Sequence, residues 1–142
     1  MTTQRVADWM TSGPITIATG TNLAAARARM ERDEIRRLLV IDDSGRLAGI
    51  VTWGDVAEAW PSDFTPFEPF EVRELMARVR VDEIMTSPVL TIDADATIAE
   101  AANLMFERRI GAVPVLDGGQ LVGIMSSSDV LQGLVRVLSE RD

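Results

Sequence analysis

Apolar residues along the chain fall into short runs typical of buried strands and longer stretches with the spacing of an amphipathic helix. In the first half, Leu23, Ala26 and Met30 recur at helical spacing, with arginines at most of the positions between them. Short apolar runs precede and follow this stretch. The predicted elements are, in order, a strand at residues 15–17, a helix from Thr21, strands at residues 38–41 and 47–51, and a helix from Thr52.

The second half repeats this order of elements. Met10 aligns with Met85 at an offset of 75 residues, and Gly49 aligns with Gly123 at an offset of 74 because the turn between them is one residue shorter. The predicted elements are a strand at residues 89–92, a helix from Thr97, strands at residues 112–116 and 121–125, and a helix from Ser126. Pro114 has no N–H to donate, so we expect its strand to lie at a sheet edge or to begin there. Each half therefore predicts a β-α-β-β-α unit.

A segment rich in proline and phenylalanine joins the halves. Residues 60–70 hold three prolines, which oppose a helix, and three of the four phenylalanines of the chain. Because a pure linker would be polar, we expect these rings to pack against something. Residues 71–79 predict a short helix. The predicted organisation is a first repeat at residues 1–60, a linker with a short helix at 61–79, and a second repeat at 80–142.

Composition narrows the classes of function. The chain has 142 residues, of which 46% are hydrophobic, enough for a folded core. It contains no cysteine and no histidine, which excludes thiolate and Ser-His-Asp catalysis, and we expect neither an enzyme nor a metal site. A net charge of −8 disfavours nucleic acid as a partner. The N-terminus lacks the apolar region of a signal peptide and no apolar run reaches the length of a membrane span, so we expect a soluble, cytoplasmic protein.

The halves share an octet that carries the most specific polar pattern of the chain. It occupies residues 49–56 and 123–130, and each copy ends a predicted strand at a hydroxyl and has an aspartate three positions later. The hydroxyl–carboxylate pairs are Thr52 with Asp55 and Ser126 with Asp129. This spacing is typical of a capping box, in which both side chains bond to the backbone at the start of a helix. Two copies in matching context also suggest a pair of related small-molecule sites.

These octets, the Met-Thr-Ser tripeptides at residues 10–12 and 85–87, and the apolar run at residues 110–115 resemble the CBS domain, found in tandem. The resemblance covers nearly the whole chain and extends to small stand-alone bacterial CBS-pair proteins. It implies an α/β (α+β) fold in which two β-α-β-β-α units pack sheet to sheet about a pseudo-twofold axis and leave two clefts. Such clefts commonly bind AMP, ADP, ATP or S-adenosylmethionine, and the pairs usually form homodimers that regulate enzymes or transporters.

The resemblance also assigns roles to the polar residues of the octets. It implies that Asp55 and Asp129 accept hydrogen bonds from the ribose hydroxyls, for which an ionised carboxylate offers two acceptor oxygens. The hydroxyls of Thr52 and Ser126 are then expected to point toward ribose or phosphate. Helix capping alone is the alternative role, and the two roles are compatible.

Two arginines before the second strand of the first repeat are candidates for phosphate binding. Members of the family often place a basic residue where this chain has Arg36 and Arg37, and a guanidinium fits a phosphate through two hydrogen bonds. The alternative is an ordinary solvated pair of arginines. The second repeat has Gly111 and Ala112 at the aligned positions, so we expect either a less charged part of the ligand there or a single occupied cleft.

Apolar residues complete the expected ligand environment. By the same resemblance, the adenine wall comprises Ile17, Ile92, Leu38, Ala112 and Val113, for each of which plain core packing is the alternative. The leading hypothesis is a non-catalytic regulatory module that binds an adenine-containing ligand in the cleft between the repeats and acts through dimerisation. The second is a structural or interaction protein with vestigial ligand clefts, favoured by the phenylalanine-rich linker and the missing arginines of the second repeat.

Overall fold

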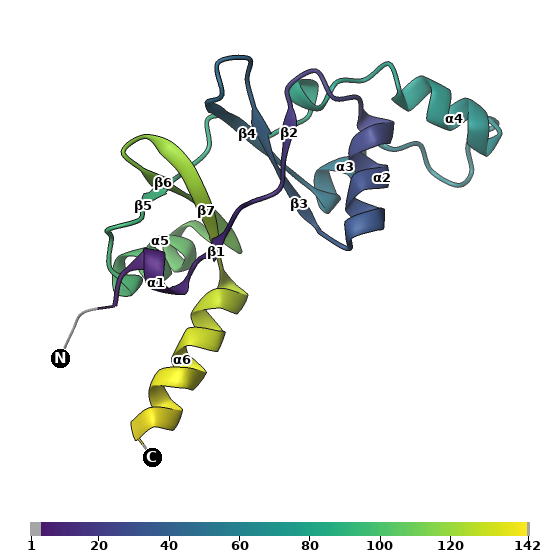
Figure 1. Cartoon of the computed structure of the whole chain (residues 1–142). Helices are drawn as coiled ribbons and strands as arrows, with labels where there is room; N and C mark the ends of the chain where they lie inside the picture. The colour runs from purple at the N-terminus through teal and green to yellow at the C-terminus, as the bar shows by residue number, and fades with distance from the viewer. Residues whose placement is uncertain (1–3, 142) are drawn as a thin grey trace. The chain divides into compact units, whose positions relative to one another are not determined.

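The structure, a computed structural model, describes residues 4–141 (Figure 1). It divides into two units, which we describe one at a time. The first-repeat unit spans Ile15–Val89, and the second-repeat unit joins the N-terminal segment up to Pro14 to the chain from Leu90 onward. Each unit contains the β-α-β-β-α order expected from the sequence, so the predicted α/β class is confirmed.

The first-repeat unit is a three-stranded sheet with helices. Its elements are β2 (Thr16–Ala18), α2 (Leu23–Asp33), β3 (Arg37–Ile41), β4 (Leu47–Thr52), α3 (Trp53–Ala59), α4 (Pro69–Met76) and a 3-10 helix, η1 (Val81–Glu83). The strand order is β2-β3-β4. Strand β2 runs parallel to β3, and β4 runs antiparallel to it, with Arg37 opposite Thr52.

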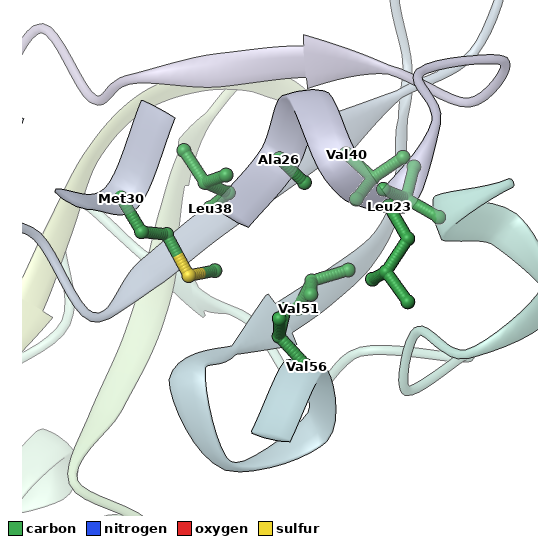
Figure 2. Packing of buried hydrophobic residues seen from close by; sticks show 8 residues of the cluster. Leu23, Ala26, Met30, Leu38, Val40, Val51 and Val56 are labelled. Carbon is green, nitrogen blue, oxygen red and sulfur yellow. The ribbon is translucent and has the colours of Figure 1, made fainter. Parts of the chain in front are cut away.

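Helix α2 supplies one side of the hydrophobic core of this unit. Its side chains Leu23, Ala26 and Met30 are almost fully buried, at the helical spacing that the sequence predicts. Figure 2 shows these side chains directed at the sheet and at α3. The other buried members of the cluster are Leu38, Val40, Val51, Val56 and Val81. Burial of this apolar surface is the main force that holds α2 on the sheet.

The second-repeat unit has a four-stranded sheet. Its elements are α1 (Val6–Trp9), β1 (Thr11–Ser12), β5 (Ile92–Asp93), α5 (Ile98–Arg108), β6 (Ala112–Asp117), β7 (Gln120–Ser126) and α6 (Ser127–Arg141). The strand order is β1-β7-β6-β5. Strand β5 is shorter than the strand predicted at residues 89–92 and pairs with β6 in parallel.

Each unit is completed by the segment that precedes the opposite repeat. Val6 is fully buried in the core of the second-repeat unit, and its N–H donates to the Ala96 carbonyl at 2.8 Å. The aligned residue Val81 is fully buried in the first-repeat unit, where its N–H donates to the Thr21 carbonyl at 2.8 Å. The boundaries of the structural units therefore differ from those of the repeats in the sequence, because each leading segment belongs to the unit of the other repeat.

Pro114 does not mark an edge strand. Strand β6 lies between β7 and β5, so the edge prediction is wrong. Strand β5 pairs only with Val115 and Leu116, which leaves the position of Pro114 paired with β7 alone. At the aligned position of the other unit, the Leu39 N–H donates to the Ile15 carbonyl at 3.4 Å. Proline is tolerated in this inner strand because no strand pairs with it on the side where that hydrogen bond would form.

Helix starts lie close to their predicted positions. Thr97 caps α5 as predicted, whereas Asn22 rather than Thr21 caps α2. The Asn22 side-chain oxygen accepts the Ala25 N–H at 2.8 Å, a bond that an asparagine makes well at this position. Helix α4 begins and ends earlier than predicted, since Pro69 is compatible with the first turn, where no N–H is needed.

The linker phenylalanines do not pack into a core. Phe64 is 97% exposed, Phe70 is 63% exposed and Phe67 is 47% exposed. Within the described residues these rings are thus exposed to different degrees, and the expectation that they pack against something stays a prediction. The core of the first-repeat unit is filled by its sheet, α2, α3 and η1, and Trp60 at the start of the linker packs against it.

Candidate functional site

The glycine that opens each octet lies where another chain segment passes very close. Ile50 exchanges two backbone hydrogen bonds with Thr86, at 2.9 and 3.1 Å. A Cβ atom added to Gly49 would lie 2.9 Å from the Thr86 carbonyl oxygen, and one added to Gly123 would lie 2.7 Å from the Thr11 carbonyl oxygen. Only glycine allows this approach, a constraint that the sequence pattern alone does not reveal.

The hydroxyl–aspartate pairs form capping boxes in both repeats. At the start of α3, the Asp55 N–H donates to Thr52 Oγ1 at 3.1 Å, and the Thr52 N–H donates to Asp55 Oδ2 at 2.8 Å. At the start of α6, the Asp129 N–H donates to Ser126 Oγ at 3.1 Å, and the Ser126 N–H donates to Asp129 Oδ2 at 2.8 Å. The capping role predicted from the spacing is confirmed in both copies.

A backbone hydrogen bond holds each helix start against the strand that precedes the octet. The Trp53 N–H donates to the Arg36 carbonyl at 2.8 Å, and the Ser127 N–H donates to the Gly111 carbonyl at 2.9 Å. In the first-repeat unit, Arg37 is also the strand partner of Thr52. The structure therefore brings the backbones of the two arginines beside the Thr52–Asp55 capping box, at one end of the sheet.

The two aspartates differ in their remaining hydrogen bonds. Asp129 Oδ1 accepts a hydrogen bond from Thr11 Oγ1 at 2.9 Å, so both oxygens of this carboxylate have protein partners. Among residues 4–141, Asp55 Oδ1 has no hydrogen-bond partner. Thr11 lies 118 positions before Asp129, and no local sequence pattern predicts this contact. Among the described residues, Asp55 therefore has one acceptor oxygen that is not bonded. The equivalent oxygen of Asp129 is bonded to Thr11.

The candidate arginines also differ from the arginines of α2. On α2, the ion pairs are Arg27 with Glu31, Arg29 with Asp33 and Arg32 with Asp33. Hydrogen bonds from Arg32 and then Arg29 lower the pKa of Asp33 below its ordinary value. Arg36 and Arg37 are exposed, and within the part of the chain that the structure describes neither forms an ion pair. Their guanidinium groups are thus not engaged by carboxylates as those of α2 are.

The apolar candidates separate into two groups. The side chains of Leu38 and Val113 are fully buried in the cores of their own units, and Ala112 is 8% exposed. Ile17 and Ile92 are half-buried. Of these five, the two isoleucines have the most side-chain surface that a ligand could contact, and Leu38 and Val113 could contribute to an adenine wall only through backbone atoms.

Residues 4–141 contain neither a candidate metal site nor a candidate membrane-spanning helix. No group of three or more carboxylates in this range is arranged to hold a metal ion. No helix there combines the length and the apolar character needed to cross a membrane.

Comparison with protein families identifies two matching segments. The model of the CBS domain matches residues 6–62 and 81–136. A CBS domain-containing protein of Dictyostelium discoideum is 35% identical over 130 residues, which cover 91% of this chain and 90% of that protein. Other curated relatives are longer, and the chain spans between 26% and 45% of the length of three of them.

Comparison with solved structures finds similar folds in complexes with adenosine compounds. The CBS domain pair of protein MJ0100, in complex with 5′-methylthioadenosine and S-adenosyl-L-methionine, is 26% identical with a TM-score of 0.74, covering 99% of this chain and 100% of that one. CBSX2 in complex with AMP is 25% identical with a TM-score of 0.77, covering 94% of this chain and 97% of that one.

Proposed function

Because the chain belongs to the CBS domain family and carries two such domains in tandem, we propose that it is a non-catalytic regulatory module that binds an adenine-containing ligand and acts through homodimers. CBS-pair modules are generally regulatory rather than catalytic. The candidate ligands are AMP, ADP, ATP and S-adenosylmethionine, and the complexes of two similar structures with AMP and with S-adenosylmethionine support this class. The regulated partner is an enzyme or a transporter.

The observation that carries the proposal is the group of polar residues at the start of α3. Within residues 4–141, Asp55 has an oxygen without a hydrogen-bond partner, and a carboxylate can accept both vicinal hydroxyls of a ribose. Thr52 lies beside it in the capping box. Arg36 and Arg37 are adjacent and form no ion pair among the described residues, so their guanidinium groups can hold phosphate oxygens.

The second repeat is proposed to bind a less charged part of a ligand. Ser126 and Asp129 repeat the arrangement of hydroxyl and carboxylate, but Gly111 and Ala112 supply no charge. A ribose at Asp129 must also replace the hydrogen bond from Thr11. We therefore expect the residues of the first repeat to bind a nucleotide more tightly. Ile17 and Ile92, with the backbones of Leu38, Ala112 and Val113, are the proposed adenine walls.

Asp55→Ala is expected to weaken the binding of AMP or ATP at least about tenfold, because a hydrogen bond to a charged group contributes about 1.5–3 kcal/mol. It also removes one side of the α3 capping box. Glu100→Ala is the matched control, since Glu100 closes the capping box of α5 and has no proposed ligand role. Both variants should lose about 1 kcal/mol or less of stability. Calorimetry with AMP, ATP and S-adenosylmethionine gives the affinities, and thermal unfolding gives the stabilities.

Two outcomes of this experiment would contradict the proposal. The first is the absence of heat with all three ligands on folded wild-type protein. The second is an equal loss of affinity in Asp55→Ala and Glu100→Ala, which would mean that the loss reflects helix stability and no contact with ribose.

Homodimer formation is proposed to use the outer face of α6. This face carries Leu131, Leu134, Val135 and Leu138, each between 44% and 62% exposed. Gly133 of the same helix is buried against Trp9, about 150° around the helix from the centre of the apolar face. An apolar surface of this kind, opposite the packed face, is typical of a protein–protein interface.

Val135→Glu is expected to convert the dimer to a monomer, because it places a charge within the proposed apolar interface. Gln132→Glu is the control, since Gln132 is exposed on the same helix but lies outside the apolar face. Light scattering after size exclusion measures the mass of each protein. A monomeric wild type, or a dimer that survives Val135→Glu, would argue against this interface.

A second function is favoured by the exposure of the linker phenylalanines. In that alternative the chain is an interaction protein and its ligand residues are vestigial. Phe64, at 97% exposure, would then contact a partner. Mass spectrometry of small molecules that co-purify with the protein separates the two functions, because only a ligand-binding module should retain an adenine compound.

A further inference from the structure

The first-repeat unit contains a pocket that none of the proposed nucleotide-binding residues lines. It is formed by α2, the linker and α4, and its volume is about 560 Å³. Pockets of roughly 300–1,000 Å³ hold small organic molecules. Its lining includes the apolar side chains of Trp60, Phe67 and Val72, and Arg27 and Arg73 supply positive charge from two different helices.

Arg27 is held in a fixed orientation at this pocket. Its guanidinium carbon lies 4.2 Å from the ring centroid of Trp60 and 5.7 Å from that of Trp53. Its Nε donates to Glu31 Oε1 at 3.1 Å. Stacking on aromatic rings together with an ion pair orients a planar guanidinium group. The Arg27 side chain is only 33% exposed, so the orientation is set mainly by protein contacts.

The outer end of this guanidinium group has unused donors. Glu31 accepts from Nε alone, and among residues 4–141 the two terminal nitrogens of Arg27 donate no hydrogen bond. The fork of an arginine matches the two oxygens of a carboxylate or a phosphate. Arg73 forms no ion pair within the described residues and adds a second positive charge to the lining.

The acidic residues of the lining limit the charge of a ligand. Glu31 and Asp63 line the same pocket as Arg27 and Arg73, so the formal charges of the lining cancel. A ligand with several negative charges would meet these carboxylates as well as the arginines. A ligand with one negative charge can pair with Arg27 while its apolar part contacts Trp60 and Phe67.

We infer that this pocket binds a small monocarboxylate with a flat apolar body, held by the terminal nitrogens of Arg27 and by the ring of Trp60. The inference goes beyond the proposed nucleotide function, since it concerns different residues and a different class of ligand. A ligand in this pocket would contact α2, the linker and α4 together and so hold α4 against α2.

The test uses the full chain and phenylacetate, with Trp60 as an internal reporter. Titration with sodium phenylacetate should give a saturable change in tryptophan fluorescence. Phenylacetamide, which has the same shape without the charge, should bind at least about tenfold more weakly, because it lacks the charge-assisted hydrogen bonds. Phenyl phosphate, with its higher charge, should also bind more weakly than phenylacetate.

Matched arginine variants assign any binding to this pocket. Arg27→Gln should weaken phenylacetate binding at least about tenfold, since it removes the guanidinium group whose two terminal nitrogens would donate to the carboxylate. Arg29→Gln should leave it unchanged, because Arg29 lies on the same helix, is 37% exposed, pairs with Asp33 and does not line the pocket. If Arg27→Gln does not fold, Arg73→Gln serves instead, because Arg73 is exposed, and weaker binding is again expected.

Three results would overturn the inference. They are no saturable signal with phenylacetate in the wild type, equal binding of phenylacetamide, and equal weakening by Arg27→Gln and Arg29→Gln. Tighter binding of phenyl phosphate than of phenylacetate would overturn the assignment to a monocarboxylate. None of these results depends on whether AMP, ATP or S-adenosylmethionine binds elsewhere, so this pocket and the proposed function are tested separately.

Discussion

Gly123→Ala is expected to lower the free energy of unfolding by about 2 kcal/mol, although alanine is normally preferred to glycine within a strand. The added Cβ would lie 2.7 Å from the Thr11 carbonyl oxygen and 2.6 Å from the Met10 sulfur. The methionine side chain can move aside, but the carbonyl belongs to β1, which is paired with β7 through Thr11 and Ser12. Relief of the contact would therefore disrupt the β1–β7 pairing.

Gly54→Ala is the control for this substitution. Gly54 lies in α3, and the nearest atom to an added Cβ is Thr52 Oγ1 at 3.6 Å, an ordinary contact. Because alanine is favoured over glycine inside a helix by up to about 1 kcal/mol, this variant should be neutral or more stable. Urea unfolding of both variants gives the comparison. A Gly123→Ala protein as stable as the wild type would show that β1 does not constrain this position.

Features set by neighbouring residues were predicted from the sequence. The spacing of Leu23, Ala26 and Met30 identified the buried face of α2, because amphipathic periodicity directly reflects which side of a helix faces the core. The capping boxes at Thr52 and Ser126 were also predicted, since their hydrogen bonds join residues three positions apart. Small errors at helix ends, such as Thr21 in place of Asn22, arise because adjacent polar residues can both cap.

Features set by distant parts of the chain were not predicted. The burial of Val6 in the second-repeat unit depends on a segment that crosses to the opposite repeat, and apolar periodicity does not specify such a crossing. The same crossing explains Gly49, whose importance comes from the passing Thr86 backbone. The exposure of the linker phenylalanines is likewise not indicated by their apolar character, because the core of this unit is filled by other elements.

The candidate site shows the same division between local and distant information. The approach of Arg36 and Arg37 to Thr52 follows from the antiparallel pairing of β3 and β4, which the two apolar runs and their short turn indicate. The difference between Asp55 and Asp129 comes from Thr11, a residue of the crossing segment. The repeat of an octet thus predicts two similar sites, and a long-range contact makes them unequal.

Val6→Asp is expected to unfold the second-repeat unit while the first-repeat unit keeps its sheet. Val6 is fully buried and packs in a cluster with Val113, Val115 and Met125. Burial of an unpaired carboxylate costs several kcal/mol, a large part of the 5–15 kcal/mol by which typical domains are stable. Ala7→Asp is the control, because Ala7 is adjacent in α1 but exposed, and a surface substitution changes stability by only about 0.5 kcal/mol.

Hydrogen exchange resolved by peptide distinguishes the two units in this experiment. In Val6→Asp, amide protection should be lost in α5, β6 and β7 and retained in β2, β3 and β4, because Val6 contributes to the core of the second-repeat unit. If residue 6 instead supported the repeat that follows it in sequence, protection would be lost first in β2, β3 and β4. That result, or equal stability of Val6→Asp and Ala7→Asp, would refute the exchange of leading segments between the repeats.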